Sequence, residues 1–204
     1  MKRRNTDAVS PVVGVMLMLV VTIIIAAVVS AFAGGLASDT SKAPQASLSV
    51  VAVIKDIQDT NMTNWDPNYP DDFTAKNGLL FEHMGGDAFA LSDISIQLQS
   101  RDAKYTISTY DKIPTTNCLP NDVESYIMEI GDSDGFITPG DKFMLYADNC
   151  RIDDHSGFNN AAQISWKPEG AAGGMGLYLN TKAEYKVINK ASGKVIQSGT
   201  VVLV

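Results

Sequence analysis

The sequence has 204 residues and a formal net charge of −7, with 16 lysines and arginines against 23 aspartates and glutamates. An acidic chain lacks the basic footprint that nucleic-acid binding requires, so we expect no nucleic-acid partner. About 160 residues remain after the N-terminal apolar segment, which is the size of one ordinary domain.

An apolar stretch dominates the N-terminal part of the chain. No charged residue occurs between Asp7 and Asp39, and residues 9–37 are almost entirely apolar. A run of this length predicts a membrane-spanning helix. Such a helix would be roughly 43 Å long, which exceeds the ~30 Å hydrocarbon core of a bilayer. A helix that is apolar on every side is surrounded either by lipid or by other helices.

A short basic leader, residues 1–8, precedes the apolar stretch. Its positive charges, Lys2, Arg3 and Arg4, predict a cytoplasmic N-terminus and a single membrane crossing, with the rest of the chain outside. Three interpretations are open. A cleaved secretory signal would use the weak site Ala31-Phe-Ala33, although the apolar run is long for one. The others are an uncleaved anchor and cleavage before the helix.

The start of the helix carries its own local signals. Ser10 is a good N-cap, because its hydroxyl can accept a hydrogen bond from a free backbone N–H. Pro11 suits the first helical position, where an N–H is not needed. Gly34 and Gly35 predict a swivel or break near the far end. These residues predict a helix that begins directly after the leader.

The junction Asp7-Ala8-Val9-Ser10-Pro11 resembles the leader junction of archaeal type IV pilins, which carry a class III signal peptide. The resemblance implies that a prepilin peptidase cleaves between Ala8 and Val9, so that Val9 becomes the mature N-terminus. The fifth mature residue would then be Val13, where bacterial pilins carry glutamate. Without that carboxylate, apolar packing must set the register between subunits.

The same resemblance implies what the protein does. It would be a structural subunit of a type IV-like pilus, polymerised through its N-terminal helix, for adhesion and surface attachment. The implied partners are other pilin copies, the prepilin peptidase, the pilus assembly ATPase and a membrane platform protein. The subunit would sit in the cell membrane before assembly and in an extracellular filament afterwards. The alternative is a membrane-anchored extracellular binding domain that does not polymerise.

The remaining chain predicts an all-β, sandwich-like head at residues 47–204, joined to the helix by a linker at 38–46, and thus an α+β protein. Alternating apolar residues separated by turns support this assignment. The predicted strands are residues 48–54, 79–83, 94–99, 104–110, 125–130, 142–147, 162–167, 184–189 and 194–204. We expect loops at 56–77 and 170–176. Two head turns, Gly85-Gly-Asp87 and Pro139-Gly-Asp141, also resemble archaeal pilins.

The two cysteines, Cys118 and Cys150, lie in the part that is predicted to be outside the cell. An even number of cysteines in that compartment favours a disulfide between them. Two buried free thiols are the alternative, and a shared metal is less favoured because only two histidines could complete the site. The sequon at Asn61 marks a possible glycosylation site on an exported protein.

Other polar residues support only local interpretations. Asp132, Asp134 and Asp141 offer oxygen ligands for calcium, but Asp and Gly are also ordinary turn residues, and both interpretations stay open. His83 is expected at the surface, at the end of a strand. No nucleophile, base and orienting group occur together, so we expect neither an enzyme nor a cofactor.

Overall fold

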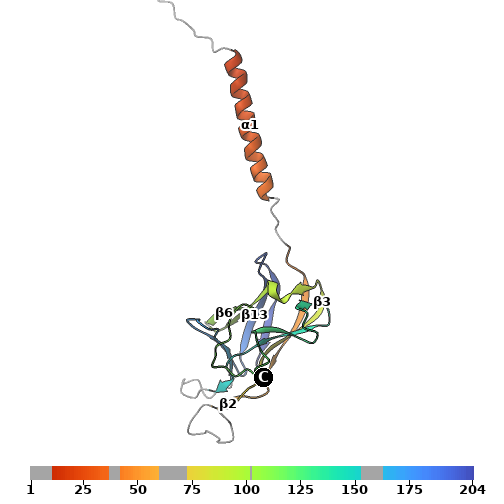
Figure 1. Cartoon of the computed structure of the whole chain (residues 1–204), viewed down its shortest axis with the longest axis vertical. Helices are drawn as coiled ribbons and strands as arrows, with labels where there is room; N and C mark the ends of the chain where they lie inside the picture. The colour runs from red at the N-terminus through yellow and green to blue at the C-terminus, as the bar shows by residue number, and fades with distance from the viewer. Residues whose placement is uncertain (1–10, 37–41, 60–72, 102, 153–162) are drawn as a thin grey trace, which may run out of the picture. The chain divides into compact units, whose positions relative to one another are not determined.

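The computed structural model describes residues 11–36, 42–59, 73–101, 103–152 and 163–204 (Figure 1). The chain divides into two compact units, Met1–Ser41 and Lys42–Val204. The leader at 1–8 and the first residues of the expected linker lie outside the described ranges. The helix followed by a strand-rich domain confirms the α+β class.

The first unit contains one helix, α1 (Pro11–Leu36), of 26 residues. Within it, Val12–Ser30 has a mean hydropathy of 3.2 and is long and apolar enough to cross a membrane. The side chains over this span are exposed. The hydroxyl of Thr22 donates to the carbonyl of Leu19 at 2.8 Å, so this polar group is satisfied inside the helix.

The second unit is built from strands and one short 3-10 helix. Their bounds are β1 (Ala46–Val53), β2 (Gln58–Asp59), β3 (Gly78–Gly86), β4 (Phe89–Ala90), η1 (Leu91–Asp93), β5 (Ile94–Ser100), β6 (Ala103–Ser108), β7 (Ile127–Ile130), β8 (Phe136–Ile137), β9 (Lys142–Tyr146), β10 (Arg151–Ile152), β11 (Gln163–Trp166), β12 (Met175–Tyr178), β13 (Lys182–Asn189) and β14 (Val195–Val202).

Two four-stranded antiparallel sheets form the body of this unit. One has the strand order β1-β3-β9-β7 and the other β14-β13-β5-β6. Three two-stranded pairs complete the described strands: β10-β2, β11-β12 and β4-β8. Only β10-β2 is parallel among the described pairs. This arrangement is the predicted sandwich-like head.

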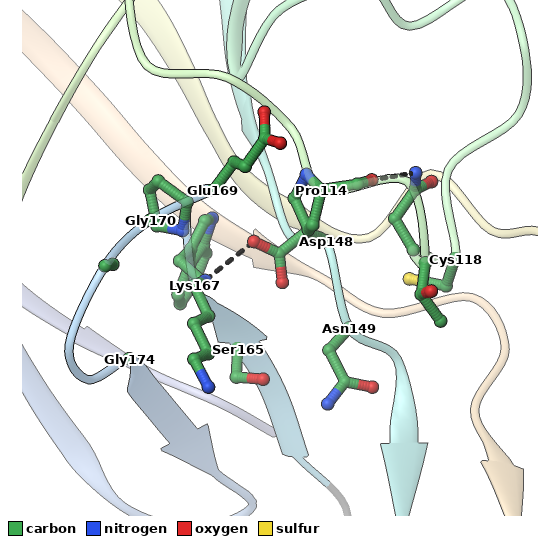
Figure 2. A pocket seen from close by; sticks show the side chains of 14 residues that line it. Pro114, Cys118, Asp148, Asn149, Ser165, Lys167, Glu169, Gly170 and Gly174 are labelled. Atoms are coloured by element: carbon green, nitrogen blue, oxygen red, sulfur yellow. Dashed lines mark hydrogen bonds between the residues drawn. The ribbon is translucent and has the colours of Figure 1, made fainter.

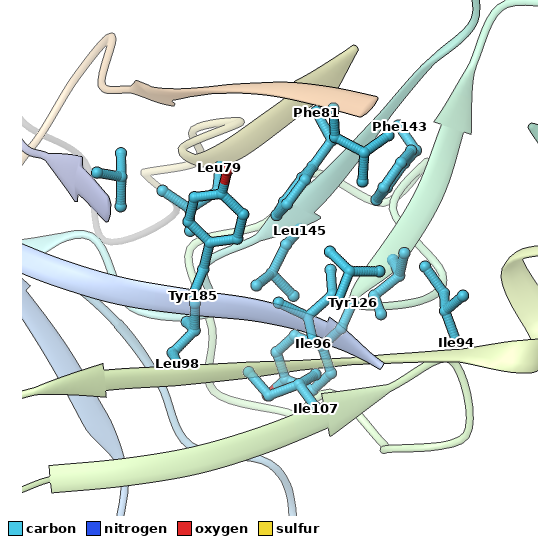
Figure 3. Close-up of a cluster of buried hydrophobic side chains, with 14 of the residues drawn as sticks. Leu79, Phe81, Ile94, Ile96, Leu98, Ile107, Tyr126, Phe143, Leu145 and Tyr185 are labelled. Carbon is cyan, nitrogen blue, oxygen red and sulfur yellow. The ribbon is translucent and has the colours of Figure 1, made fainter. Parts of the chain in front are cut away.

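The core lies between the two sheets (Figure 3). Alternate residues of β3 and β5 point into it because successive side chains of a strand face opposite sides. Phe81 of β3 stacks on Phe143 of β9 with ring centroids 4.8 Å apart. Phe81 also meets Tyr185 of β13 edge to face at 5.8 Å, which links the two sheets. Large apolar side chains from both sheets thus form one continuous core.

The connection between β6 and β7 covers the outer face of the first sheet. Leu119 and Val123 from this connection are buried with Met144 and Tyr146 of β9. Strand β9 is therefore buried on both faces. In an ordinary two-sheet sandwich, each strand has one face in the core and the other face exposed to solvent.

All nine predicted strands match strands of the structure, with small differences at the ends. For example, the segment predicted at 104–110 ends at Ser108, because the carboxylate of Asp111 accepts the Ser108 backbone N–H at 2.6 Å. The loop prediction for 170–176 is wrong at its end. Strand β12 starts at Met175, since Met175 and Leu177 are buried in the core. The two-residue strands β2, β4, β8 and β10 were not predicted.

The Gly-Gly-Asp turn fixes the start of β1. The backbone N–H of Asp87 donates to the carbonyl of Gln45 at 2.8 Å, and the Gln45 N–H donates to the Asp87 carboxylate at 3.0 Å. Gly86 has a φ of 109°, and a Cβ there would lie 2.1 Å from the Gln45 carbonyl oxygen. Glycine is required because the two backbones approach so closely.

The surface prediction for His83 is wrong, because its side chain is only 1% exposed. The Gly-Gly-Asp turn folds over the imidazole of His83. The backbone N–H of Gly85 donates to Nδ1 at 3.2 Å, and Nε2 lies 3.1 Å from the Asp87 carbonyl oxygen. Since Nδ1 accepts a hydrogen bond, the ring proton resides on Nε2, which donates to that carbonyl. His83 is a satisfied structural residue.

Candidate functional site

Helix α1 presents a long, exposed apolar surface. Its side chains from Val12 to Ser30 are exposed, including Val21 near the middle, which is 44% exposed. None of its residues is charged. Apolar surface of this extent must be covered by lipid or by protein. Helix α1 is therefore the primary candidate for membrane insertion and assembly.

The residues predicted to direct processing lie at the edge of the described chain. Ala8, Val9 and Ser10 are outside the described residues, as is the sequon residue Asn61. Pro11 is the first residue of α1, a position at which no backbone N–H is needed. Val13 lies in the first turn of α1, about half exposed, and contributes no charge there.

A disulfide joins Cys118 and Cys150, which are 32 residues apart in the chain. Both are buried in a small cluster with Ala75. The backbone N–H of Cys118 donates to the carbonyl of Asp148 at 2.8 Å, and the N–H of Ala75 donates to the Cys118 carbonyl at 2.6 Å. The disulfide thus holds the connection between β6 and β7 against the chain that follows β9.

A pocket of about 650 Å³ lies beside this disulfide (Figure 2). Asn117 from the β6–β7 connection, Asn149 after β9 and Glu169 after β11 contribute polar groups to its walls. Trp166 lines it as well, and its Nε1 is buried without a hydrogen-bond partner among the described residues. The pocket offers amide, carboxylate and backbone groups, and it contains no nucleophile and base in contact.

Asp148 organises the wall of this pocket. Its Oδ2 accepts hydrogen bonds from the Tyr126 hydroxyl and, at 2.6 Å, from the backbone N–H of Lys167. Burial raises the pKa of the Asp148 carboxyl above its ordinary value near 3.8, although both bonds act in the opposite direction. Burial also raises the pKa of Tyr126, and the Asp148 carboxyl adds to that rise.

The comparisons with known proteins concern the N-terminal unit and the first strand. Residues 7–48 match the family model described as archaeal type IV pilin, N-terminal. The N-terminal segment is therefore similar to that of archaeal type IV pilins. The match covers α1 and ends inside β1, so it gives no information about most of the head. No curated protein matches the chain.

Carboxylates gather at a second place in the head. Glu129 of β7 and Asp132 and Asp134 of the β7–β8 loop have carboxylate oxygens within 4.8 Å of one another. Asp141 is not part of this group. Its Oδ2 accepts the backbone N–H and the hydroxyl of Thr138, both at 2.7 Å, and so closes a separate turn. These bonds lower the pKa of Asp141, the hydroxyl having the largest effect.

The structure therefore brings Asp132 and Asp134, two of the three aspartates expected from the sequence, together with Glu129, which the sequence analysis did not single out. Burial raises the pKa of Glu129, and the neighbouring Asp132 and Asp134 raise it further. Its place on an alternating strand, two residues after buried Ile127, was the signal that could have identified it.

We expect replacement of Asp148 by alanine to destabilise the head by about 2–4 kcal/mol. The change leaves the Tyr126 hydroxyl and the Lys167 N–H without an acceptor, and each unsatisfied buried donor costs roughly 1–3 kcal/mol. Asp148→Asn keeps an acceptor and the volume, so it should lose less than about 1 kcal/mol. Denaturant unfolding of the full chain in detergent, followed by tryptophan fluorescence, measures both changes.

Comparison of Asp148→Asn with the unmodified protein also tests how stability depends on pH. Because the folded pKa of Asp148 is raised above its unfolded value, the folded chain holds the proton more tightly. The stability from this group is full at low pH and is lost as pH rises through the folded pKa. Over a titration from about pH 4 upward, the Asn variant should therefore gain stability relative to the unmodified protein, because the unfolded-state pKa is the ordinary value near 3.8 and the folded-state pKa lies above it. An unchanged difference across that range would contradict the assignment.

Proposed function

We propose that the chain is the precursor of a structural subunit of an archaeal type IV-like pilus that serves adhesion and surface attachment. A prepilin peptidase cleaves between Ala8 and Val9, and the subunits then polymerise through α1. The observation that carries this proposal is a charge-free helix that is exposed over Val12–Ser30 within a segment matching archaeal type IV pilins.

The length of α1 supports two successive environments. A helix of 26 residues extends about 39 Å, which is more than the ~30 Å that a bilayer core requires. Before assembly, lipid covers the apolar side chains. After assembly, neighbouring copies of α1 cover them, and the thickness of the bilayer then no longer limits the length of the helix.

The organisation of the precursor follows from this cycle. Residues 1–8 are the leader, residues 9–37 the helix, residues 38–46 the linker and residues 47–204 the head. The N-terminus lies in the cytoplasm, and the head lies outside the cell. The prepilin peptidase acts first, and an assembly ATPase and a membrane platform protein then transfer subunits to the filament. The protein itself performs no covalent chemistry.

The N-terminus of the mature protein tests the proposal. Mass spectrometry of protein recovered from sheared surface filaments should show a chain beginning at Val9. Ala8→Phe should block cleavage and hold the precursor in the membrane, because the peptidase needs a small residue before the scissile bond. Ala8→Gly is the matched control and should be processed. Mature protein that retains Met1, or normal filaments from Ala8→Phe, would contradict the cleavage site.

The second candidate function is a membrane-anchored binding domain that never polymerises. The polar pocket beside the disulfide favours it, because a pocket of about 650 Å³ could receive a small polar ligand. This alternative predicts an uncleaved N-terminus and no filaments. The same mass-spectrometric experiment therefore separates the two functions.

A further inference from the structure

Three carboxylates converge where β7 leaves the first sheet. Oxygens of Glu129, Asp132 and Asp134 lie within 4.8 Å of one another. Gly131, Ser133 and Gly135 alternate with them along the loop, and all three have positive φ, at 133°, 58° and 82°. Asp134 Oδ1 accepts the backbone N–H of Phe136 at 2.7 Å, which uses one of its two oxygens.

Glu129 differs from the two aspartates because its side chain is buried, with only 9% exposed. It occupies the inward-facing position of β7 opposite Phe143. Its Oε2 accepts the backbone N–H of Gly135 at 2.9 Å, and its Oε1 is buried with no hydrogen-bond partner among the described residues. A buried carboxylate oxygen without a partner is costly unless a cation or a proton satisfies it.

The described ion pairs do not neutralise this cluster. Lys142, which lies opposite Ile130 on β9, directs its ammonium to Glu82 at 3.6 Å. The other described pair joins Lys76 to Asp122. Glu129, Asp132 and Asp134 therefore form a cluster of oxygen ligands in which Glu129 is buried and the two aspartates are exposed.

We propose that Glu129, Asp132 and Asp134 bind one calcium ion that fastens the β7–β8 loop to the head. Calcium takes six to eight oxygen ligands in adaptable geometry, so carboxylates on a glycine-rich loop suit it, with water filling the remaining positions. Magnesium requires a stricter octahedron and is less suited. This inference goes beyond filament assembly and concerns the head alone.

The expected affinity is that of an extracellular module, with a dissociation constant on the order of 0.1–1 mM. The experiment uses the full chain in detergent at neutral pH after treatment with a chelator and dialysis. Isothermal titration with calcium chloride should give one ion per chain. Thermal unfolding at about 10 mM calcium should show a higher midpoint than without calcium, because the ion binds only the folded loop. Magnesium at the same concentration should give a much smaller shift.

Three variants locate the site. The double variant Asp132→Asn/Asp134→Asn keeps the buried Glu129 and should lose calcium binding and the thermal shift. Glu124→Gln removes one exposed charge outside the cluster and should bind calcium like the unmodified protein. Asp141→Asn should also bind normally, since Asp141 belongs to the neighbouring turn.

Several results would overturn the site. One is calcium binding by the double variant with unchanged stoichiometry and affinity. A second is equal shifts from magnesium and calcium. The third is no calcium binding by the unmodified chain up to about 10 mM, well above the expected dissociation constant. That last result would mean that a proton shared between Glu129 and Asp132 satisfies the buried oxygen instead.

Discussion

Replacing Val21 by lysine is expected to exclude the protein from the proposed filaments and to leave it in the membrane. Val21 lies near the centre of the apolar span Val12–Ser30. A lysine at the centre of a membrane helix costs about 2.5–3.5 kcal/mol on the insertion scale, while each Leu, Ile, Phe or Val contributes about −0.3 to −0.6 kcal/mol. The remaining apolar residues therefore keep insertion favourable, helped by snorkelling of the long side chain.

The core of the proposed filament would offer no such relief. Helices related to α1 by assembly carry no acidic residue that could pair with the new ammonium group. An unpaired buried charge costs several kcal/mol even after local relaxation. Because 1.4 kcal/mol corresponds to a factor of ten, we expect incorporation to fall by at least a hundredfold.

Quantifying sheared filaments against membrane-bound protein measures this effect. Val21→Leu is the matched control, because it keeps the position apolar, and it should be incorporated. Lysine-bearing protein in filaments at the level of the control would argue against a helix-packed core. Loss of the variant from the membrane as well would show that insertion, and not assembly, had failed.

Loss of the disulfide is expected to lower the free energy of unfolding of the head by about 4 kcal/mol. The chain-entropy model gives this figure for a closed loop of about 33 residues, and small exported domains typically lose 2–5 kcal/mol. The disulfide anchors the β6–β7 connection, which covers the outer face of β9. Unfastening that connection would also expose Met144 and Tyr146 to solvent.

Denaturant unfolding of the full chain in detergent, with and without reductant, measures the loss. The variant Cys118→Ala/Cys150→Ala should be as unstable as the reduced protein and should not respond to reductant. Alkylation followed by mass analysis verifies the thiol state in each sample. An unchanged unfolding midpoint with both thiols fully alkylated would rule out a stabilising role for this bond.

The sequence predicted those features that depend on local patterns. A charge-free run longer than a bilayer predicts α1, and alternating apolar residues predict the larger strands of both sheets. Strand β12 was missed because Gly173, Gly174 and Gly176 resemble a loop, while its place in the core is set by pairing with β11. Pairing of this kind is non-local, so a single segment carries no sign of it.

In the candidate sites as well, local patterns were predicted and non-local contacts were missed. Asp132 and Asp134 stood out as loop carboxylates, whereas Glu129 lies within a predicted strand and drew no prediction, because charged side chains are seldom buried. Asp141 lies close in sequence and belongs to another turn. The burial of His83 depends on Gly85 and Asp87 folding back over the ring, which periodicity does not reveal.

The uniform surface of α1 has a consequence for the geometry of assembled copies. The helix has no polar stripe, and even the Thr22 hydroxyl is bonded within the helix. The hydrophobic effect therefore favours no particular side of the helix as the contact face when two copies pack. The choice is left to the shapes of side chains, which interlock in ridges and grooves. In the proposed filament, rotation and rise per subunit would then be set by the packing of methyl groups. Exchanging valine for leucine would alter the symmetry of the filament while the helix stays apolar.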